Sequence, residues 1–242
     1  LFFIDGDVEI EEYFIEKAIS ILKKNTTCGA VYGELREYQY TTDYKDIVHK
    51  IVSRYGIHKQ KRVMFGPGIF MTTKSVVLKT GFFNETYDRN EDTEYTLRLS
   101  TSHSILAIPD LMGTHHTISY FNSTRYRNNI LKTEGYFLKL VMKSFISNPV
   151  GFWQLMTKNA GISYSFFINI LFTLSLIYRS PNTMFFLLLT TAADFYFGYK
   201  KTKNSTFILQ RLHTHYAYPI LAFLSLVNIQ KNNIFYKVSL VA

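Results

Sequence analysis

Long windows without charged side chains most constrain the fold of this 242-residue chain. Residues 159–178 contain no charged side chain, and residues 180–199 contain only Asp194. A helix that crosses the hydrocarbon core of a membrane needs about 20 mostly apolar residues. The pattern predicts transmembrane helices at about 159–178 and 181–199, although buried core helices of a soluble domain would give a similar pattern.

A third window, residues 212–230, also lacks charged side chains when histidine is counted as neutral. Its first half contains His213, His215 and Pro219, so its hydrophobic pattern is weaker. We expect a third transmembrane helix at about 212–230, with an interfacial helix as the alternative. The chain is therefore expected to cross the membrane several times.

Basic residues set the expected orientation of these helices. Arg179 is the only basic residue between the first two windows, whereas Lys200, Lys201, Lys203 and Arg211 follow the second. Short loops rich in Lys and Arg stay on the cytoplasmic side of a membrane. The sequence therefore predicts that the part before residue 159 faces the cytoplasm.

Residues 126–158 have the pattern of a basic amphipathic segment at a membrane surface. Apolar residues there alternate with Lys132, Lys139 and Lys143. The net charge of +9 suits anionic partners such as nucleotide phosphates or acidic lipid headgroups. Nucleic acid is not an expected partner, because the positive charge is scattered and no known binding motif is present.

Residues 1–125 alternate between short strand and helix patterns, which predicts an α/β domain. The run Leu1–Ile4 indicates a strand buried on both faces of a parallel sheet. Because the chain begins directly on this strand, we expect a fragment that lacks earlier strands. Apolar spacing over residues 47–55 predicts an amphipathic helix, and Pro109 is expected to close a strand over residues 104–108.

Two carboxylates follow the opening strand in the sequence Asp5-Gly6-Asp7. Strand alternation would send both side chains to the same side, where they would repel each other. A hard divalent cation with oxygen ligands would relieve that repulsion. The alternative is an ordinary Asp-Gly turn at the end of a strand.

Several segments, in this order and spacing, together resemble the family 2 glycosyltransferases of the GT-A fold. Asp5-Gly6-Asp7 resembles the DxD motif of that family, and Glu91-Asp92 resembles its ED segment. Pro109 followed by His115 resembles the end of its catalytic domain. The remaining matches are the glycine segment Gly66-Pro67-Gly68, the turn Gly81-Phe82-Phe83 and the pair Arg127-Asn128.

The resemblance implies the C-terminal half of a GT-A domain, a Rossmann-like nucleotide-diphospho-sugar transferase fold, over residues 1–125. It implies that Asp7 and His115 bind a divalent cation, Mg²⁺ or Mn²⁺, and that Asp92 is the catalytic base of an inverting transfer. The donor, a nucleotide-diphosphate sugar, would be bound by the following set: Asp5, Asp7, Gly66, Gly68, Glu91 and Arg127.

Each of these residues also has a simpler interpretation. Asp92 could cap the following helix, and Gly66 and Gly68 could serve a turn alone. His116 competes with its neighbour His115 for the metal role. Arg127 could bind lipid phosphate instead of diphosphate.

The expected function is metal-dependent transfer of one sugar to a hydroxyl of a lipid-linked or glycan acceptor at the cytoplasmic face of a membrane. No Gln-x-x-Arg-Trp segment of the processive members is present, which favours single transfer over polymer extrusion. The alternative is a non-catalytic membrane protein that binds acidic lipid or a partner. The presence of Asp5, Asp7, Asp92 and His115 together argues against a decayed site.

Overall fold

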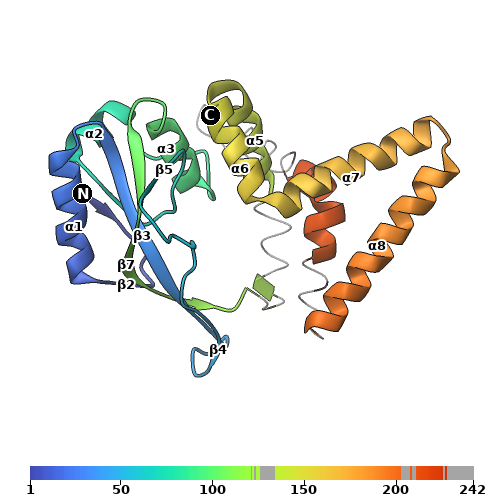
Figure 1. Ribbon diagram of the computed structural model, residues 1–242, viewed down its shortest axis with the longest axis horizontal. Helices are drawn as coiled ribbons and strands as arrows, with labels where there is room; N and C mark the ends of the chain where they lie inside the picture. Colours follow the sequence, from blue (N-terminus) through green and yellow to red (C-terminus); the bar gives the residue numbers. More distant parts are fainter. Residues whose placement is uncertain are drawn as a thin grey trace, which may run out of the picture. The chain divides into compact units, whose positions relative to one another are not determined.

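The computed structural model describes residues 1–120, 122, 124–125, 134–202, 208, 211–225 and 227. The chain is mixed α/β, and its contacts divide it into two units, which are described separately (Figure 1). The first unit consists of Leu1–Tyr120 and Met142–Phe152. The second contains the helices α7 (Ala160–Ile177) and α8 (Pro181–Thr202) and the π-helix η1 (His213–Ala217).

Within the described residues, seven strands of the first unit form one mixed sheet with the central order β1-β6-β3-β7-β2. Strand β4 pairs with β3, and β5 pairs with β7. Strands β3 and β7 are parallel, and the other pairs are antiparallel. The strands are β1 (Phe2–Phe3), β2 (Val8–Ile10), β3 (Cys28–Tyr40), β4 (Ile47–Ile51), β5 (Lys61–Val63), β6 (Phe70–Thr72) and β7 (Ser104–Ile118).

Helix α1 (Glu12–Lys24) covers one side of the sheet beside β3 (Figure 1). Its apolar residues recur at helical spacing, and Phe14 and Ala18 are fully buried against the sheet. Lys23 and Lys24 occupy the last turn, where the helix dipole favours positive charge. This helix agrees with the amphipathic pattern of the sequence.

Helix α3 (Glu91–Leu99) packs through an aromatic cluster centred on Tyr95. The Tyr95 ring stacks on Phe70, with centroids 5.7 Å apart, and contacts Phe83 at 4.7 Å. Tyr95 is fully buried, so this cluster anchors α3 to strand β6. Helix α2 (Lys74–Thr80) lies between β6 and α3 in sequence and is capped by the Thr73 hydroxyl.

Several expectations for this unit are wrong. Strand β1 pairs antiparallel with β6 and not within a parallel sheet. It is only half-buried, because it ends the sheet order among the described strands. Residues 47–51 form strand β4 instead of a helix, since their β-branched side chains pair with β3. Strand β7 continues through Pro109 to Ile118, and Pro109 falls at an irregularity in the β3–β7 register.

The end of α5 (Glu134–Ser147) and the start of α6 (Pro149–Lys158) belong to the first unit and pack on α3. The Asn148 side chain donates to the Leu97 carbonyl at 3.1 Å. Gly151 lies so close to Leu97 that an added Cβ would clash with it. The expected segment 126–158 is thus helical over 134–147 and 149–158, and its start lies outside the described residues.

In the described part of the chain, α7 is the one helix long and apolar enough to cross a membrane. Its bounds match the first expected span within two residues. Helix α8 covers the second expected span, but its polar residues lower its hydropathy. The third window is described only as far as residue 225 and at 227, with η1 at 213–217. Several crossings therefore remain a prediction.

Asp194, the only charge in the second window, is paired within the second unit. Its carboxylate accepts from Arg211 Nε at 2.7 Å and lies 2.9 Å from His215 Nδ1. A carboxylate in an apolar helix is costly unless it finds such partners. The pairing explains how an otherwise apolar helix tolerates this residue.

Candidate functional site

A turn and a strand pairing bring Asp7 and His115 together. Val8 N donates to the Asp5 carbonyl at 3.3 Å, so the chain turns between Asp5 and Val8, where strand β2 begins. Strand β2 then pairs antiparallel with β7, with Val8 opposite His115. The result places the Asp7 carboxylate 3.2 Å from His115 Nε2, although the residues are 108 positions apart.

Gly113 permits this close approach of β2 to β7. It pairs with Ile10, and an added Cβ would collide with the backbone carbonyl oxygen of Glu9. Only a residue without a side chain lets the two strands pair at this point. Gly113 thereby helps to set the distance between Asp7 and His115, a role that sequence reasoning missed.

The other nitrogen of His115 meets a second carboxylate. His115 Nδ1 lies 3.0 Å from Oε2 of Glu37, a fully buried residue of β3. Glu37 also accepts from Gln39 Nε2 at 2.8 Å and forms an ion pair with Arg54 at 2.7 Å. Burial alone would raise the pKa of Glu37, but the bonds from His115 and Gln39 and the charge of Arg54 together lower it.

Asp5 faces a different group, around Gly68. A Cβ built on Gly68 would lie 3.4 Å from Asp92 Oδ2 and 3.6 Å from Asp5 Oδ1. The two carboxylates therefore flank the same point above the glycine backbone. Because the chain turns between Asp5 and Val8, Asp5 and Asp7 point to different partners, and the expected strand alternation is wrong here.

Asp92 lies in the first turn of α3 and is half-buried. Burial raises its pKa to about 6, and the nearby charges of Glu91 and Asp5 act in the same direction. Hydrogen bonds from Thr93 oppose the shift, with Thr93 N donating to Asp92 Oδ1 at 2.7 Å. A carboxylate whose pKa is raised toward neutrality is suited to general-base chemistry.

Asp92 is not the N-cap of α3. Asn90 occupies that position in a left-handed conformation with φ 62°, and its side chain makes no cap bond. The capping alternative is therefore wrong for Asp92.

Thr96 links the Gly66-Pro67-Gly68 loop to the helix that carries Asp92. Gly66 N donates to the buried Thr96 hydroxyl at 3.0 Å, and that hydroxyl donates to the Asp92 carbonyl at 2.9 Å. The glycine loop and the carboxylate are thus held in one hydrogen-bonded unit. Sequence reasoning missed Thr96, which carries no motif signal of its own.

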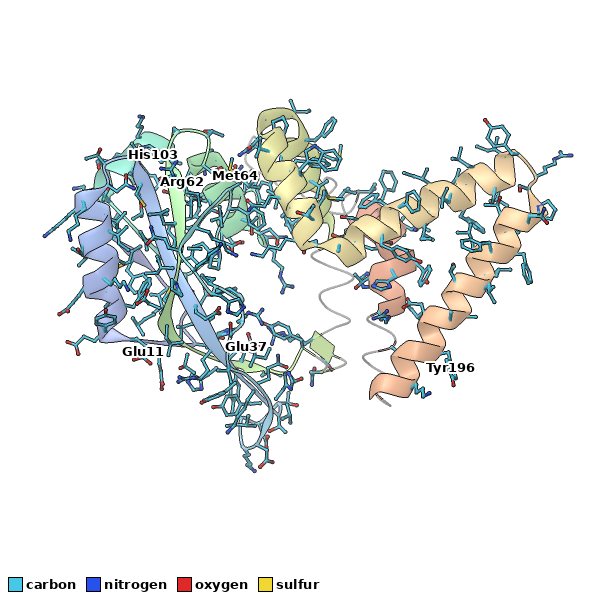
Figure 2. All side chains as sticks on the ribbon, in the orientation of Figure 1. Glu11, Glu37, Arg62, Met64, His103 and Tyr196 are labelled. Carbon is cyan, nitrogen blue, oxygen red and sulfur yellow. The ribbon has the colours of Figure 1, made fainter. Side chains whose placement is uncertain are left out.

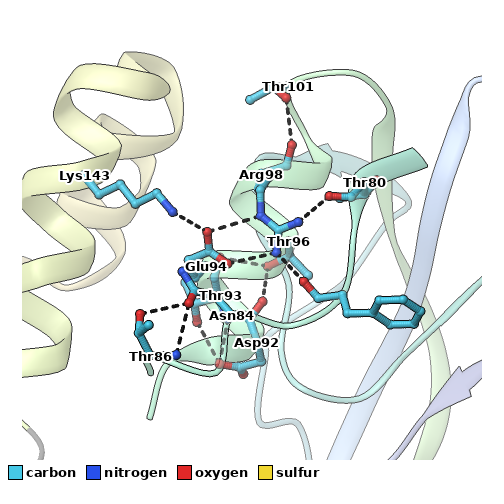
Figure 3. Close-up of polar contacts among 11 residues, drawn as sticks. Thr80, Asn84, Thr86, Asp92, Thr93, Glu94, Thr96, Arg98, Thr101 and Lys143 are labelled. Carbon is cyan, nitrogen blue, oxygen red and sulfur yellow. Dashed lines mark hydrogen bonds and ion pairs between the residues drawn. The ribbon is translucent and has the colours of Figure 1, made fainter. Parts of the chain in front are cut away.

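A second network fixes the opposite side of α3. The buried carboxylate of Glu94 accepts from Arg98 and, at 2.7 Å, from Lys143 Nζ of α5 (Figure 3). Arg98 also donates to the backbone carbonyls of Thr80 and Phe82. Two cations offset the cost of burying Glu94, and they tie α3 to its neighbours.

The arrangement can be tested for its fit to a divalent cation. Among the described residues, no group of three or more His, Cys, Asp or Glu side chains is placed to hold a metal ion. Asp7 and His115 form a pair, with an oxygen and a nitrogen aimed at each other. A Mg²⁺ ion commonly takes one or two carboxylates together with substrate phosphates, so a two-residue set fits a cation that arrives with a diphosphate.

The structure thus places Asp7 beside His115, and it places Asp5 and Asp92 beside Gly68. Gly66 is bonded to Thr96 of α3, the helix that also carries Glu91 and Asp92. His116 is excluded from this group because it faces Tyr40 and Glu9. Arg127 lies outside the described residues. A scan against protein-family models and a search of curated proteins each found no match for this chain.

Proposed function

We propose that this chain is a metal-dependent inverting glycosyltransferase. It would move one sugar from a nucleotide-diphosphate sugar to a hydroxyl of a lipid-linked or glycan acceptor. The observation that carries the proposal is the meeting of Asp7 with His115, next to the turn that sends Asp5 toward Gly68 and Asp92. These residues come from four separate parts of the chain.

Asp7 Oδ2 and His115 Nε2 would hold Mg²⁺ or Mn²⁺. When bound, the cation supplies charge neutralisation to the diphosphate leaving group. Asp5 lies on the other side of the turn, where it can accept hydrogen bonds from sugar hydroxyls. The bare backbone at Gly68 leaves room for a ligand between Asp5 and Asp92.

Asp92 would take the proton of the acceptor hydroxyl during attack on the sugar carbon. With a pKa of about 6, its carboxylate is ionised at neutral pH and more basic than an exposed aspartate. Attack from the side opposite the diphosphate breaks the sugar–phosphate bond in a single displacement. The stereochemistry at that carbon is therefore inverted.

A membrane location is part of the proposal. Helix α7 is apolar and mostly exposed, as a lipid-facing helix would be. At the α5–α6 junction, four large apolar side chains are exposed in the first unit: Met142, Phe145, Ile146 and Val150. Exposed apolar side chains of this kind suit contact with a membrane surface. The site would face the cytoplasm, where nucleotide sugars are made.

A screen of nucleotide sugars tests the proposal. The full-length protein in detergent or vesicles is incubated with each donor, with and without Mn²⁺, and release of the nucleoside diphosphate is measured. We expect release from one donor class, dependent on the metal and lost in Asp7→Asn. Release that is equal with and without metal, or equal in Asp7→Asn, contradicts the proposal.

A further inference from the structure

We propose that Glu37 is a positioning residue for the metal site, because it fixes the orientation and the tautomer of His115. The inference rests on the proposed function, since it assigns His115 Nε2 to a divalent cation. Glu37 itself does not touch the cation or the substrate. It lies on β3 (Figure 2), and strand β7, which carries His115, separates β3 from β2, the strand that follows Asp7.

The two nitrogens of His115 face two carboxylates. Nδ1 lies 3.0 Å from Glu37 Oε2, and Nε2 lies 3.2 Å from Asp7 Oδ2. Both carboxylates only accept hydrogen bonds, but Glu37 is fully buried and lies closer to the ring, so we assign the ring proton to Nδ1. In the neutral ring, Nε2 then presents its lone pair to Asp7. A divalent cation bound between His115 Nε2 and Asp7 would use this lone pair and would offset the repulsion between the two acceptors.

The backbone gives Glu37 a fixed position for this role. In the parallel pairing of β3 and β7, Glu37 is directly opposite His115. The Glu37 side chain is fully buried, and Gln39, Arg54 and the Tyr120 hydroxyl, at 3.4 Å, all donate to it. With so many donors, the carboxylate cannot rotate away from the imidazole. Histidine metal ligands commonly donate their second nitrogen to such a carboxylate.

Glu34 offers a matched control on the same strand. It is also buried, and its carboxylate accepts from Ser53 Oγ and from the backbone nitrogens of Tyr55 and Ile57, each at 2.7 Å. These bonds hold the loop that follows β4 and involve no histidine. If buried carboxylates on β3 serve stability alone, Glu34→Gln and Glu37→Gln should behave alike.

The test measures Mn²⁺ binding to the full-length protein by electron paramagnetic resonance in the presence of a saturating nucleoside diphosphate, because the two-residue site is expected to hold the cation together with a diphosphate. We expect Glu37→Gln to weaken Mn²⁺ affinity by about 10–100-fold. Glu34→Gln should bind Mn²⁺ as the wild type does, although thermal unfolding should show that both variants lose stability. Unchanged Mn²⁺ affinity in Glu37→Gln, or an equal loss in Glu34→Gln, overturns the inference.

A measurement on the wild type keeps the inference testable if Glu37→Gln does not fold. In ¹⁵N-histidine-labelled protein without metal, the neutral ring of His115 should carry its proton on Nδ1. A proton on Nε2 instead overturns the inference.

Failure of the proposed function looks different. If His115→Ala and Asp7→Asn both keep the wild-type Mn²⁺ affinity, the metal site itself is wrong, and the inference falls with it. If these two variants lose Mn²⁺ while Glu37→Gln keeps it, only the role of Glu37 is wrong.

Discussion

Replacing Asp92 with Asn separates catalysis from stability at this site. Asn keeps the shape of the side chain and an oxygen that accepts from Thr93 N, but it cannot take a proton from an acceptor hydroxyl. General-base catalysis contributes typically about 10²–10⁴-fold, so we expect the transfer rate to fall by that factor. Donor and metal affinity should change little, because Asp7 and His115 are untouched.

The same substitution should stabilise the protein at pH 8. The pKa of Asp92 rises from 3.8 in the unfolded chain to about 6 in the folded protein. The folded state therefore holds the proton more tightly, and stability is lost as the pH rises from 3.8 to about 6. A shift of this size corresponds to about 3 kcal/mol as an upper bound, since Asp92 is half-buried. Losing a negative charge near the start of α3 opposes the gain by about 0.3–1 kcal/mol.

The assay pairs kinetics with unfolding. The wild-type kcat/KM should fall about tenfold per pH unit below pH 6, as Asp92 becomes protonated. Thermal unfolding should show Asp92→Asn to be more stable than the wild type at pH 8, with the difference shrinking toward pH 4. An Asp92→Asn protein that retains wild-type transfer, or that is less stable than the wild type at pH 8, refutes this reasoning.

Three further substitutions probe other parts of the account. Gly68→Ala should lower donor affinity without loss of stability, because the added methyl group enters the space between Asp5 and Asp92. Titration with the donor measures this affinity, and an unchanged value would argue against a ligand there. Gly113→Ala should push β2 away from β7, lower the free energy of unfolding by about 1–3 kcal/mol and weaken metal affinity. If neither the unfolding free energy nor the metal affinity changes, Gly113 does not have this role. Single cysteines at Ser180 and Asn204 test topology, and labelling from outside should occur at Ser180 alone; the reverse pattern refutes the orientation.

The helices of the first unit could be predicted because their apolar residues have helical spacing. Helix α1 shows this, since Phe14 and Ala18 lie four positions apart and both are buried. The spacing of residues 47–52 was equally compatible with a helix, and only pairing with β3 makes Ile47–Ile51 a strand. Such pairing is a long-range contact that local periodicity does not contain.

The residues of the candidate site could be predicted in part, because each motif identifies the residues that it contains. The proximity of Asp7 and His115 depends on the pairing of β2 with β7, which no local pattern encodes. Glu37 stands between Arg36 and Tyr38-Gln39 in the sequence, where no apolar pattern indicates burial, so its complete burial could not be predicted. A resemblance identifies the residues that a family shares. Residues that contact them from a neighbouring strand, such as Glu37, can be recognised only once the strand pairing is known.

The most direct test of the central claim is an anomalous diffraction experiment on the full-length protein with Mn²⁺ and a nucleoside diphosphate. The account predicts an anomalous peak bonded to both an Asp7 carboxylate oxygen and His115 Nε2, at about 2.0–2.2 Å from each. The diphosphate should complete the coordination on the side of the Asp5–Val8 turn. A bound Mn²⁺–diphosphate whose metal contacts neither Asp7 nor His115 would contradict the account.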